Sequence, residues 1–255
     1  MGDARIPVAL QLYTVREEAA RDFIGTLRRI AAMGYAGVQI SGNMGGLSAR
    51  EMKRILGDLG LRCAGAHVGL TQLENELSSL LDYYAVLECP YLVLPVLPRE
   101  FYEGKTDWAA LGARLNKIGA ACRERGLGFA YHDHDMEFRR LGDRYLWDII
   151  LDHTDPALVK GELDTYWAVY AGADPAAWLE KHPGRCPLLR LKDMAPGPER
   201  AFAEVGEGII DFKPICARFE AQGGEWYIVE QDLCARPPLE SAAISLRHLR
   251  EWGIA

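Results

Sequence analysis

Two histidines and three acidic residues lie close together in the segment FAYHDHDMEF, residues 129–138. His132 and His134 are two positions apart, with acidic side chains between and after them. Imidazole and carboxylate groups bind divalent metals, and they transfer protons near neutral pH. The segment opens with apolar residues typical of a buried strand, so it predicts that reactive side chains lie where a strand ends.

Most other apolar runs in the chain also end in polar residues. These runs finish as ALQLYTVR, VQISGN, GAHVG, ELDTYW, LLRLKDM and YIVEQD, whereas YLVLPVLP has no ionisable group until Arg99. Active sites of (β/α)₈ barrels are built at the carboxyl ends of the strands, so this pattern is typical of such a barrel.

The apolar runs predict eight strands, with helices between most of them. We expect strands near residues 6–13, 36–41, 62–68, 91–96, 127–132, 159–164, 187–191 and 225–231, and a last helix near 239–252. Strands that alternate with helices pair in parallel through right-handed crossovers. The sequence therefore predicts a single (β/α)₈ TIM-barrel domain over residues 1–255. A doubly wound open sheet is the competing architecture, and the absence of a glycine-rich phosphate turn after the first strand disfavours it.

Local signals mark where several helices begin and end. Ser48 and Glu51 have the spacing of a capping box. Four glycines occupy positions where a helix end favours a positive φ, namely Gly34, Gly60, Gly126 and Gly223. The longest irregular stretch is KDMAPGPERAFAEVGEGIIDF, residues 192–212, which follows the seventh strand and is a candidate functional loop.

Side chains two apart on a strand share a face, so inward groups from several strand ends should converge above the barrel. His132, Asp164 and Glu230 are expected to meet there. Three nitrogen and oxygen donors suit a divalent metal ion such as Mn²⁺, Zn²⁺ or Mg²⁺. The sequence thus predicts a metal site with these three ligands.

Composition excludes several classes of partner. The net charge is −7 and no block of Lys or Arg stands out, which disfavours nucleic acid as a partner. We find no apolar stretch long enough to span a membrane and no signal peptide. None of the six cysteines belongs to a C-x-x-C pair, so we expect reduced thiols and a cytoplasmic protein.

Six segments in order resemble the xylose isomerase-like TIM barrels, also called sugar phosphate isomerases/epimerases. They are QLYTVR at 11–16, MGYAGVQI at 33–40, YHDHDMEF at 131–138, ELDTYW at 162–167, RLKDM at 190–194 and VEQD at 229–232. The resemblance covers nearly the whole chain. It implies a small carbohydrate substrate and a homodimer as one option for the assembly, although no residues of a subunit contact can be identified.

The resemblance also implies one divalent metal held by four side chains from strands five to eight. The ligands of strands six and eight map to Asp164 and Glu230, and the glutamate of strand five is replaced by His132. The histidine of strand seven is replaced by Arg190, which has no free lone pair and cannot be a ligand. The frequent glutamate of strand two is replaced by Gln39.

The resemblance implies an isomerase or epimerase that removes the proton next to a carbonyl and forms an enediolate held by the metal. Glu230 is the expected metal-bound acid/base, and His134 is the expected second proton carrier. Arg190 and Lys192 either neutralise an oxyanion or phosphate or balance the charges of Asp164 and Glu230.

Other residues are candidates for substrate binding, each with an ordinary structural alternative. Gln11 and Tyr13 share a strand face, and Arg16 lies on the first loop. His67 faces either the pocket or the core. Trp167 either stacks on a sugar or packs in the core.

Three alternatives to the isomerase remain. One is a metal-dependent dehydratase or lyase acting on a keto-sugar or keto-inositol, because loss of a β-substituent shares the early steps. Another is a barrel that binds a sugar without converting it, because Arg190 and Gln39 depart from the family pattern. The third, an endonuclease for abasic DNA, shares the fold but needs a basic groove, which the net charge disfavours.

Overall fold

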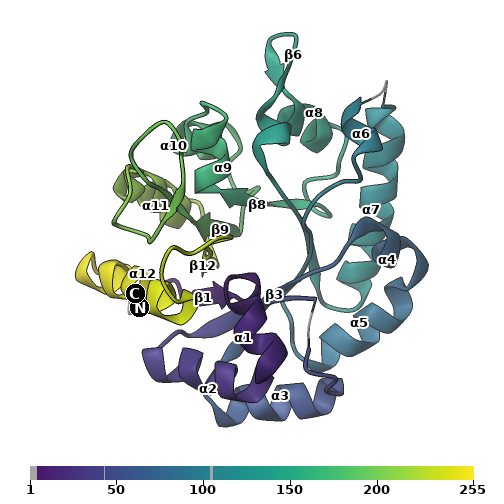
Figure 1. Ribbon diagram of the computed structural model, residues 1–255. Helices are drawn as coiled ribbons and strands as arrows, with labels where there is room; N and C mark the ends of the chain where they lie inside the picture. Colours follow the sequence, from purple (N-terminus) through teal and green to yellow (C-terminus); the bar gives the residue numbers. More distant parts are fainter. Residues whose placement is uncertain (1–4, 43, 104–105) are drawn as a thin grey trace.

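The computed structural model describes residues 5–42, 44–103 and 106–255, and a closed parallel barrel lies at their centre (Figure 1). The order of the strands round the barrel is β1-β12-β9-β8-β5-β4-β3-β2. These strands are β1 (Val8–Gln11), β2 (Gly37–Ser41), β3 (Arg62–His67), β4 (Tyr91–Leu94), β5 (Gly128–His132), β8 (Lys160–Asp164), β9 (Leu188–Leu191) and β12 (Trp226–Val229). Each lies within one of the eight predicted runs, so the predicted TIM barrel is confirmed.

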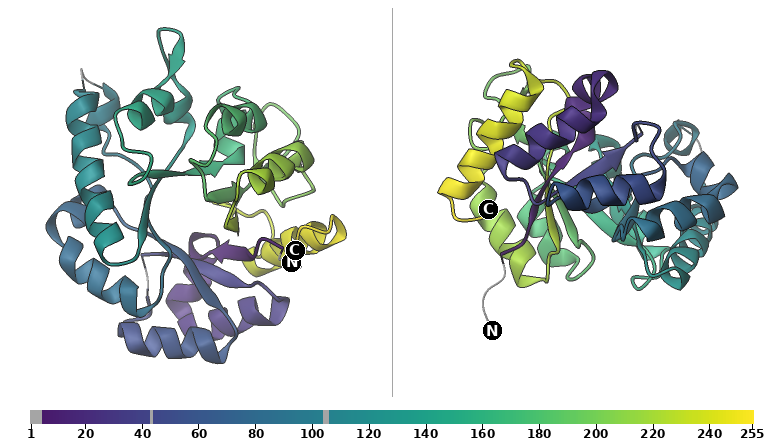
Figure 2. Two further views of the ribbon diagram at one scale, coloured as in Figure 1. Left: turned by 180° about the vertical axis from the view of Figure 1, so that it is seen from behind. Right: turned by 90° about the horizontal axis from the view of Figure 1, so that it is seen from below.

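Helices surround the strands as an outer ring (Figures 1 and 2). They are α1 (Arg16–Arg21), α2 (Phe23–Met33), α3 (Ala49–Asp58), α4 (Leu70–Asn75), α5 (Leu77–Val86), α6 (Glu100–Glu103), α7 (Trp108–Glu124), α8 (Leu146–Asp152), α9 (Thr165–Tyr170), α10 (Pro175–Lys181), α11 (Phe212–Ala221) and α12 (Pro238–Glu251). Two 3₁₀ turns, η1 (Leu12–Val15) and η2 (Asp135–Phe138), follow β1 and β5 closely. Among the described residues, no helix is both long enough and apolar enough to cross a membrane.

The helix ends follow the predicted local signals. Ser48 and Glu51 form the capping box at the start of α3. All four predicted glycines have a positive φ, for example 93° at Gly34 after α2. The six cysteines are free thiols.

Two short antiparallel ribbons project beyond the barrel. β6 (Arg140–Leu141) pairs with β7 (Arg144–Tyr145), and β10 (Asp193–Met194) pairs with β11 (Phe202–Ala203). The second ribbon lies inside the stretch that the sequence predicts to be irregular. The Asp193 carboxylate anchors this stretch, because it accepts N–H bonds from Met194, Gly206, Gly208 and Ile210 at 2.8–3.1 Å.

The core has two parts, as the geometry of a filled barrel requires. The larger part lies between the strands and the ring of helices, where Leu10, Tyr131 and Leu189 meet helix residues such as Leu27. A smaller cluster of alternate strand residues fills the barrel interior and includes Ala9, Val93, Ala130, Leu188, Trp226 and Ile228. This interior cluster forms an apolar floor.

The next inward positions toward the carboxyl ends of the strands are polar. Two residues after Ala9, Ala130 and Ile228 come Gln11, His132 and Glu230, and all three side chains are at least 95% buried. Strand alternation therefore places a buried polar layer directly above the apolar floor.

Candidate active site

A cavity of about 360 Å³ opens at the carboxyl end of the barrel. Six predicted site residues line it, namely Tyr13, His67, His132, His134, Arg190 and Glu230. The sequence did not single out the remaining lining residues, which are Ser41, Pro95, Val96 and Asp232. The cavity is thus formed where strand ends converge, which is the place predicted for it.

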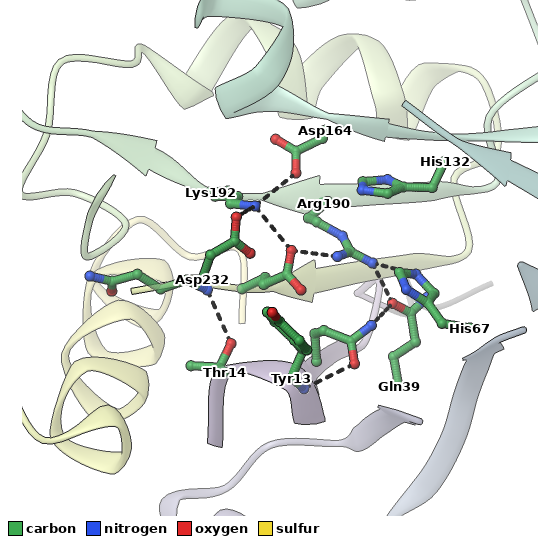
Figure 3. Close-up of polar contacts among 12 residues, drawn as sticks. Tyr13, Thr14, Gln39, His67, His132, Asp164, Arg190, Lys192 and Asp232 are labelled. Atoms are coloured by element: carbon green, nitrogen blue, oxygen red, sulfur yellow. Dashed lines mark hydrogen bonds and ion pairs between the residues drawn. The ribbon is translucent and has the colours of Figure 1, made fainter. Parts of the chain in front are cut away.

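Four predicted site residues lie below or behind the cavity wall. Gln11 is fully buried beneath it and donates to Gln39 Oε1 at 2.6 Å. Lys192 and Asp164 are buried, and the Lys192 ammonium is paired with Asp164 and Asp232 (Figure 3). Trp167 packs 5.4 Å from the His134 ring, measured between centroids.

Arg16 does not reach the cavity. Its guanidinium donates to the backbone carbonyls of Tyr13 and Asp232, at 2.8 and 3.0 Å, and lies over the Tyr13 ring. Arg16 therefore joins the loop after β1 to the loop after β12, and its predicted contact with substrate is not supported by this placement.

Arg190 is the centre of the polar layer, and its side chain is 1% exposed. The guanidinium donates from Nη1 to Glu230 Oε2 at 2.5 Å and from Nη2 to Gln39 Oε1 at 2.6 Å (Figure 3). It also forms a close ion pair with Glu162. These partners come from β2, β8 and the end of β12, so one side chain from β9 joins opposite parts of the barrel.

Arg190 also determines the state of His67. Nη2 of Arg190 lies 2.8 Å from His67 Nε2, and a guanidinium can only donate. His67 Nε2 must therefore accept, which makes the 3.4 Å approach of Glu162 Oε1 to the same nitrogen a close contact rather than a hydrogen bond. Burial and the charge of Arg190 lower the pKa of His67, in agreement with a neutral ring.

Lys192 forms a second cationic centre beside Arg190. Its Nζ lies 2.7 Å from Asp232 Oδ2, 3.2 Å from Glu230 Oε2 and 3.6 Å from Asp164 Oδ2. The rings of Trp167 and Phe202 lie 5.2 and 5.1 Å from the ammonium. Burial alone would lower the pKa of Lys192, but Glu230 and the other carboxylates raise it, so the side chain is charged.

His132 and His134 lie together on the cavity wall, with ring centroids 4.8 Å apart. Burial and the charge of Lys192 lower the pKa of His134 to about 3, and burial with the charge of Arg190 also lowers that of His132 well below its usual range. Both rings are therefore neutral at pH 7. His134 Nδ1 is buried and has no hydrogen-bond partner among the described residues.

The carboxyl groups differ in their affinity for protons. Burial opposes ionisation of Glu230, but the charges of Arg190 and Lys192 hold its pKa well below the usual range. Burial raises the pKa of Asp164 to about 7 despite the charge of Lys192. Burial and the charge of Glu230 also raise the pKa of Asp232, so Asp232 accepts a proton more readily than Glu230 does.

The sequence analysis missed three functional candidates. Glu162 and Asp232 were not selected, although each lies two residues from a selected carboxylate on the same strand face. Glu137 was not selected either. Its buried carboxylate accepts the backbone N–H of His134 at 2.8 Å and hydroxyl bonds from Tyr102 and Tyr131, so it positions the His134 segment.

The three predicted metal ligands are not placed together as the ligands of one metal ion would be. The described residues contain no group of three or more His, Cys, Asp and Glu side chains placed to hold a metal ion. The ammonium of Lys192 lies between Asp164 and Glu230, and His132 Nδ1 lies 3.2 Å from the Glu162 carbonyl. A divalent cation does not fit beside Arg190 and Lys192 as these side chains are arranged, since like charges repel.

Comparison with known proteins identifies the family. A family model described as xylose isomerase-like TIM barrel matches residues 27–252. A sugar phosphate isomerase/epimerase from Parabacteroides distasonis superposes with a TM-score of 0.83 at 26% identity, covering 98% of this chain and 95% of that one.

Curated relatives are inosose dehydratases. That of Clostridium beijerinckii is 28% identical over 176 residues, which cover 62% of this chain and 58% of the relative. That of Geobacillus kaustophilus is 25% identical over 264 residues, covering 88% of this chain and 85% of the relative. The first of these matches thus spans less than two thirds of the relative's length.

We predict that Arg190→Met destabilises the protein by about 3–5 kcal/mol, because it leaves Glu162 and Glu230 buried without their main countercharge. Urea unfolding monitored by circular dichroism measures the change in the free energy of unfolding. The control is Arg28→Met on the exposed part of α2, which should shift this free energy by less than about 0.5 kcal/mol. Equal stability of both variants would contradict the role assigned to Arg190.

We predict that Asp164→Asn changes the pH dependence of stability. The raised pKa means that folded Asp164 binds a proton more readily than unfolded Asp164, so its contribution to stability falls as the pH rises toward about 7. Relative to Asp164→Asn, the wild type should lose about 2–3 kcal/mol between pH 5 and pH 8. Urea unfolding at both pH values tests this, with exposed Asp143→Asn as the control. A parallel pH dependence for the wild type and Asp164→Asn would refute the assigned pKa.

Proposed function

The chain belongs to the xylose isomerase-like TIM barrel family, a family of sugar-processing enzymes, and from this premise we propose that it removes the proton next to the carbonyl of a small polyhydroxylated compound. The product of this step is an enediolate, and returning the proton elsewhere gives isomerisation or epimerisation. One observation supports the proposal. A buried guanidinium, neutral histidines and a carboxylate of raised pKa line the same cavity.

Each side chain has a role in this step. Arg190 lines the cavity and offers positive charge to the carbonyl oxygen, where negative charge develops. Asp232 is the better base among the two lining carboxylates, because its pKa is raised while that of Glu230 is lowered. Lys192, bound to both carboxylates, holds them in place.

The sequence predicts His134 as the second proton carrier, but its ring is neutral because its pKa is lowered to about 3, so it offers the substrate a hydrogen bond rather than a proton. Asp232, which holds the α-proton after the first step, can return it. Glu137 holds the backbone of His134 at the cavity wall. Glu230, the residue that the sequence favours as acid/base, is better suited to orient Arg190.

A second outcome, dehydration of a keto-inositol or keto-sugar, is supported by the curated relatives named inosose dehydratase. It shares the first step: the C–H bond breaks, the electron pair forms the enediolate, and a β-hydroxyl then leaves as water after accepting a proton. Asp232, which holds the α-proton after the first step, lines the cavity and can supply that proton.

The divalent metal, the cytoplasmic location and a homodimer remain predictions from the sequence. The reaction steps above use only side chains of this chain and involve no metal.

We predict that the protein catalyses exchange of the substrate's α-proton with solvent. Proton NMR in D₂O with inosose, 3-keto-glycosides and ketohexoses should show loss of the α-proton signal for at least one of them. Asp232→Asn should slow this exchange about 10²–10⁴-fold, since it removes the base and leaves a similar shape. Asp143→Asn is the control and should exchange at the wild-type rate.

The same samples separate the two outcomes. Isomerisation or epimerisation gives a deuterated product of unchanged formula, whereas dehydration gives a product that mass spectrometry shows to have lost one water. Saturable binding of a ketose without any exchange would instead support the binding protein, and an unchanged rate in Asp232→Asn would exclude Asp232 as the base.

A further inference from the structure

We propose that the cations of Arg190 and Lys192 together take the position and supply the positive charge of the divalent ion that the family resemblance implies, so that the protein polarises its substrate without a metal. The inference rests on the proposed function and identifies the groups that polarise the substrate at that same site. It follows because residues that were expected to bind a metal form ion pairs with Arg190 and Lys192 instead.

The two cations occupy the position expected for the metal. The expected ligands come from β5, β8, β9 and the end of β12, and the position on β9 is Arg190. Arg190 Nη1 lies 2.5 Å from Glu230 Oε2, and Lys192 Nζ lies 3.2 Å from the same oxygen. Metal–oxygen bonds are about 2.0–2.2 Å long for zinc, so the two cations already occupy the space in which a metal would bind this oxygen.

The two cations also match the metal in charge. Arg190 and Lys192 carry two positive charges, as a divalent ion does. Four acidic side chains contact them, namely Glu162, Asp164, Glu230 and Asp232.

Arg190 cannot easily be displaced. Its guanidinium binds side chains from three other strands of the barrel and contacts the ring of His67 as well. The neighbouring carboxylates raise its pKa against the effect of burial, so it remains charged. A metal would have to displace a side chain that is 1% exposed and already paired with Glu162, Glu230 and Gln39.

The chemistry then needs no Lewis acid. As Asp232 takes the α-proton, the C–H bond breaks, its electron pair becomes the carbon–carbon double bond, and the carbonyl oxygen becomes an enediolate oxygen. Arg190 lines the cavity, so its positive charge lies beside the space in which this oxygen forms. A fixed positive charge in a site of low dielectric stabilises such an oxyanion strongly.

Metal content of the wild-type protein tests the inference first. Protein purified without chelator, analysed by inductively coupled plasma mass spectrometry and titrated with Mn²⁺ and Zn²⁺ by calorimetry, should contain much less than one ion per chain and show no saturable site. Its α-proton exchange should be unchanged by EDTA. One tightly bound ion per chain that is lost in Glu230→Gln would overturn the inference.

A gain-of-binding variant gives a second test. Arg190→His restores an imidazole at the β9 position and removes one cation, so we expect Mn²⁺ or Zn²⁺ to bind with about one ion per chain and to raise the melting temperature. Arg28→His on α2 is the matched control and should bind no ion. If Arg190→His binds no more metal than this control, the inference is wrong. If it fails to fold, the wild-type measurement still decides.

These tests are independent of the proposed function. Exchange that occurs only with an added metal would refute the metal-free site and retain the proposed reaction. Absence of exchange under all conditions would refute the proposed reaction, whereas the metal measurements on the wild type and on Arg190→His would still decide whether the two cations replace an ion.

Discussion

A charged guanidinium buried inside the barrel is the constraint on which the site depends. An unpaired charge there would be very unfavourable, so the guanidinium must be surrounded by countercharges and acceptors, and only its Nε lacks a partner among the described residues. Glu162 and Glu230 supply the countercharges, while Gln39 and His67 accept further hydrogen bonds. The identities of the surrounding side chains follow from this need.

The same constraint links the fold to the chemistry. Strand alternation places Arg190 two residues above Leu188 of the apolar floor and two residues below Lys192. The floor excludes water from beneath, and Trp167 and Phe202 cover Lys192 from the side. Electrostatic interactions are strong in such a site, which explains the large and opposite pKa shifts of Glu230 and Asp164.

Much of the architecture could be predicted from the sequence, because it depends on local patterns. Apolar runs located the eight strands, and glycines such as Gly34 marked the helix ends. The rule that residues two apart share a face correctly brought His132 and His134 to one wall of the cavity. It could equally have identified Glu162 from Asp164 and Asp232 from Glu230.

The contacts among charged groups could not be predicted in this way. The spacing of Asp164 and Glu230 is the same whether a metal or a lysine lies between them, and the choice depends on where Lys192 places its long side chain. The alternative that Arg190 and Lys192 balance carboxylate charge agrees with the observed contacts. Arg16 was predicted to reach substrate because it lies near the site, but its side chain donates hydrogen bonds to backbone carbonyls instead.

The most direct measurement is a crystal structure of the wild-type protein soaked in Mn²⁺, with anomalous diffraction recorded. Our account predicts that Lys192 Nζ lies between Asp164 and Glu230, that Arg190 remains paired with Glu230, and that no anomalous peak appears within this cluster. An anomalous peak bound by Glu230 and Asp164, with Lys192 displaced, would contradict the central claim that these two cations form the charged centre of the site.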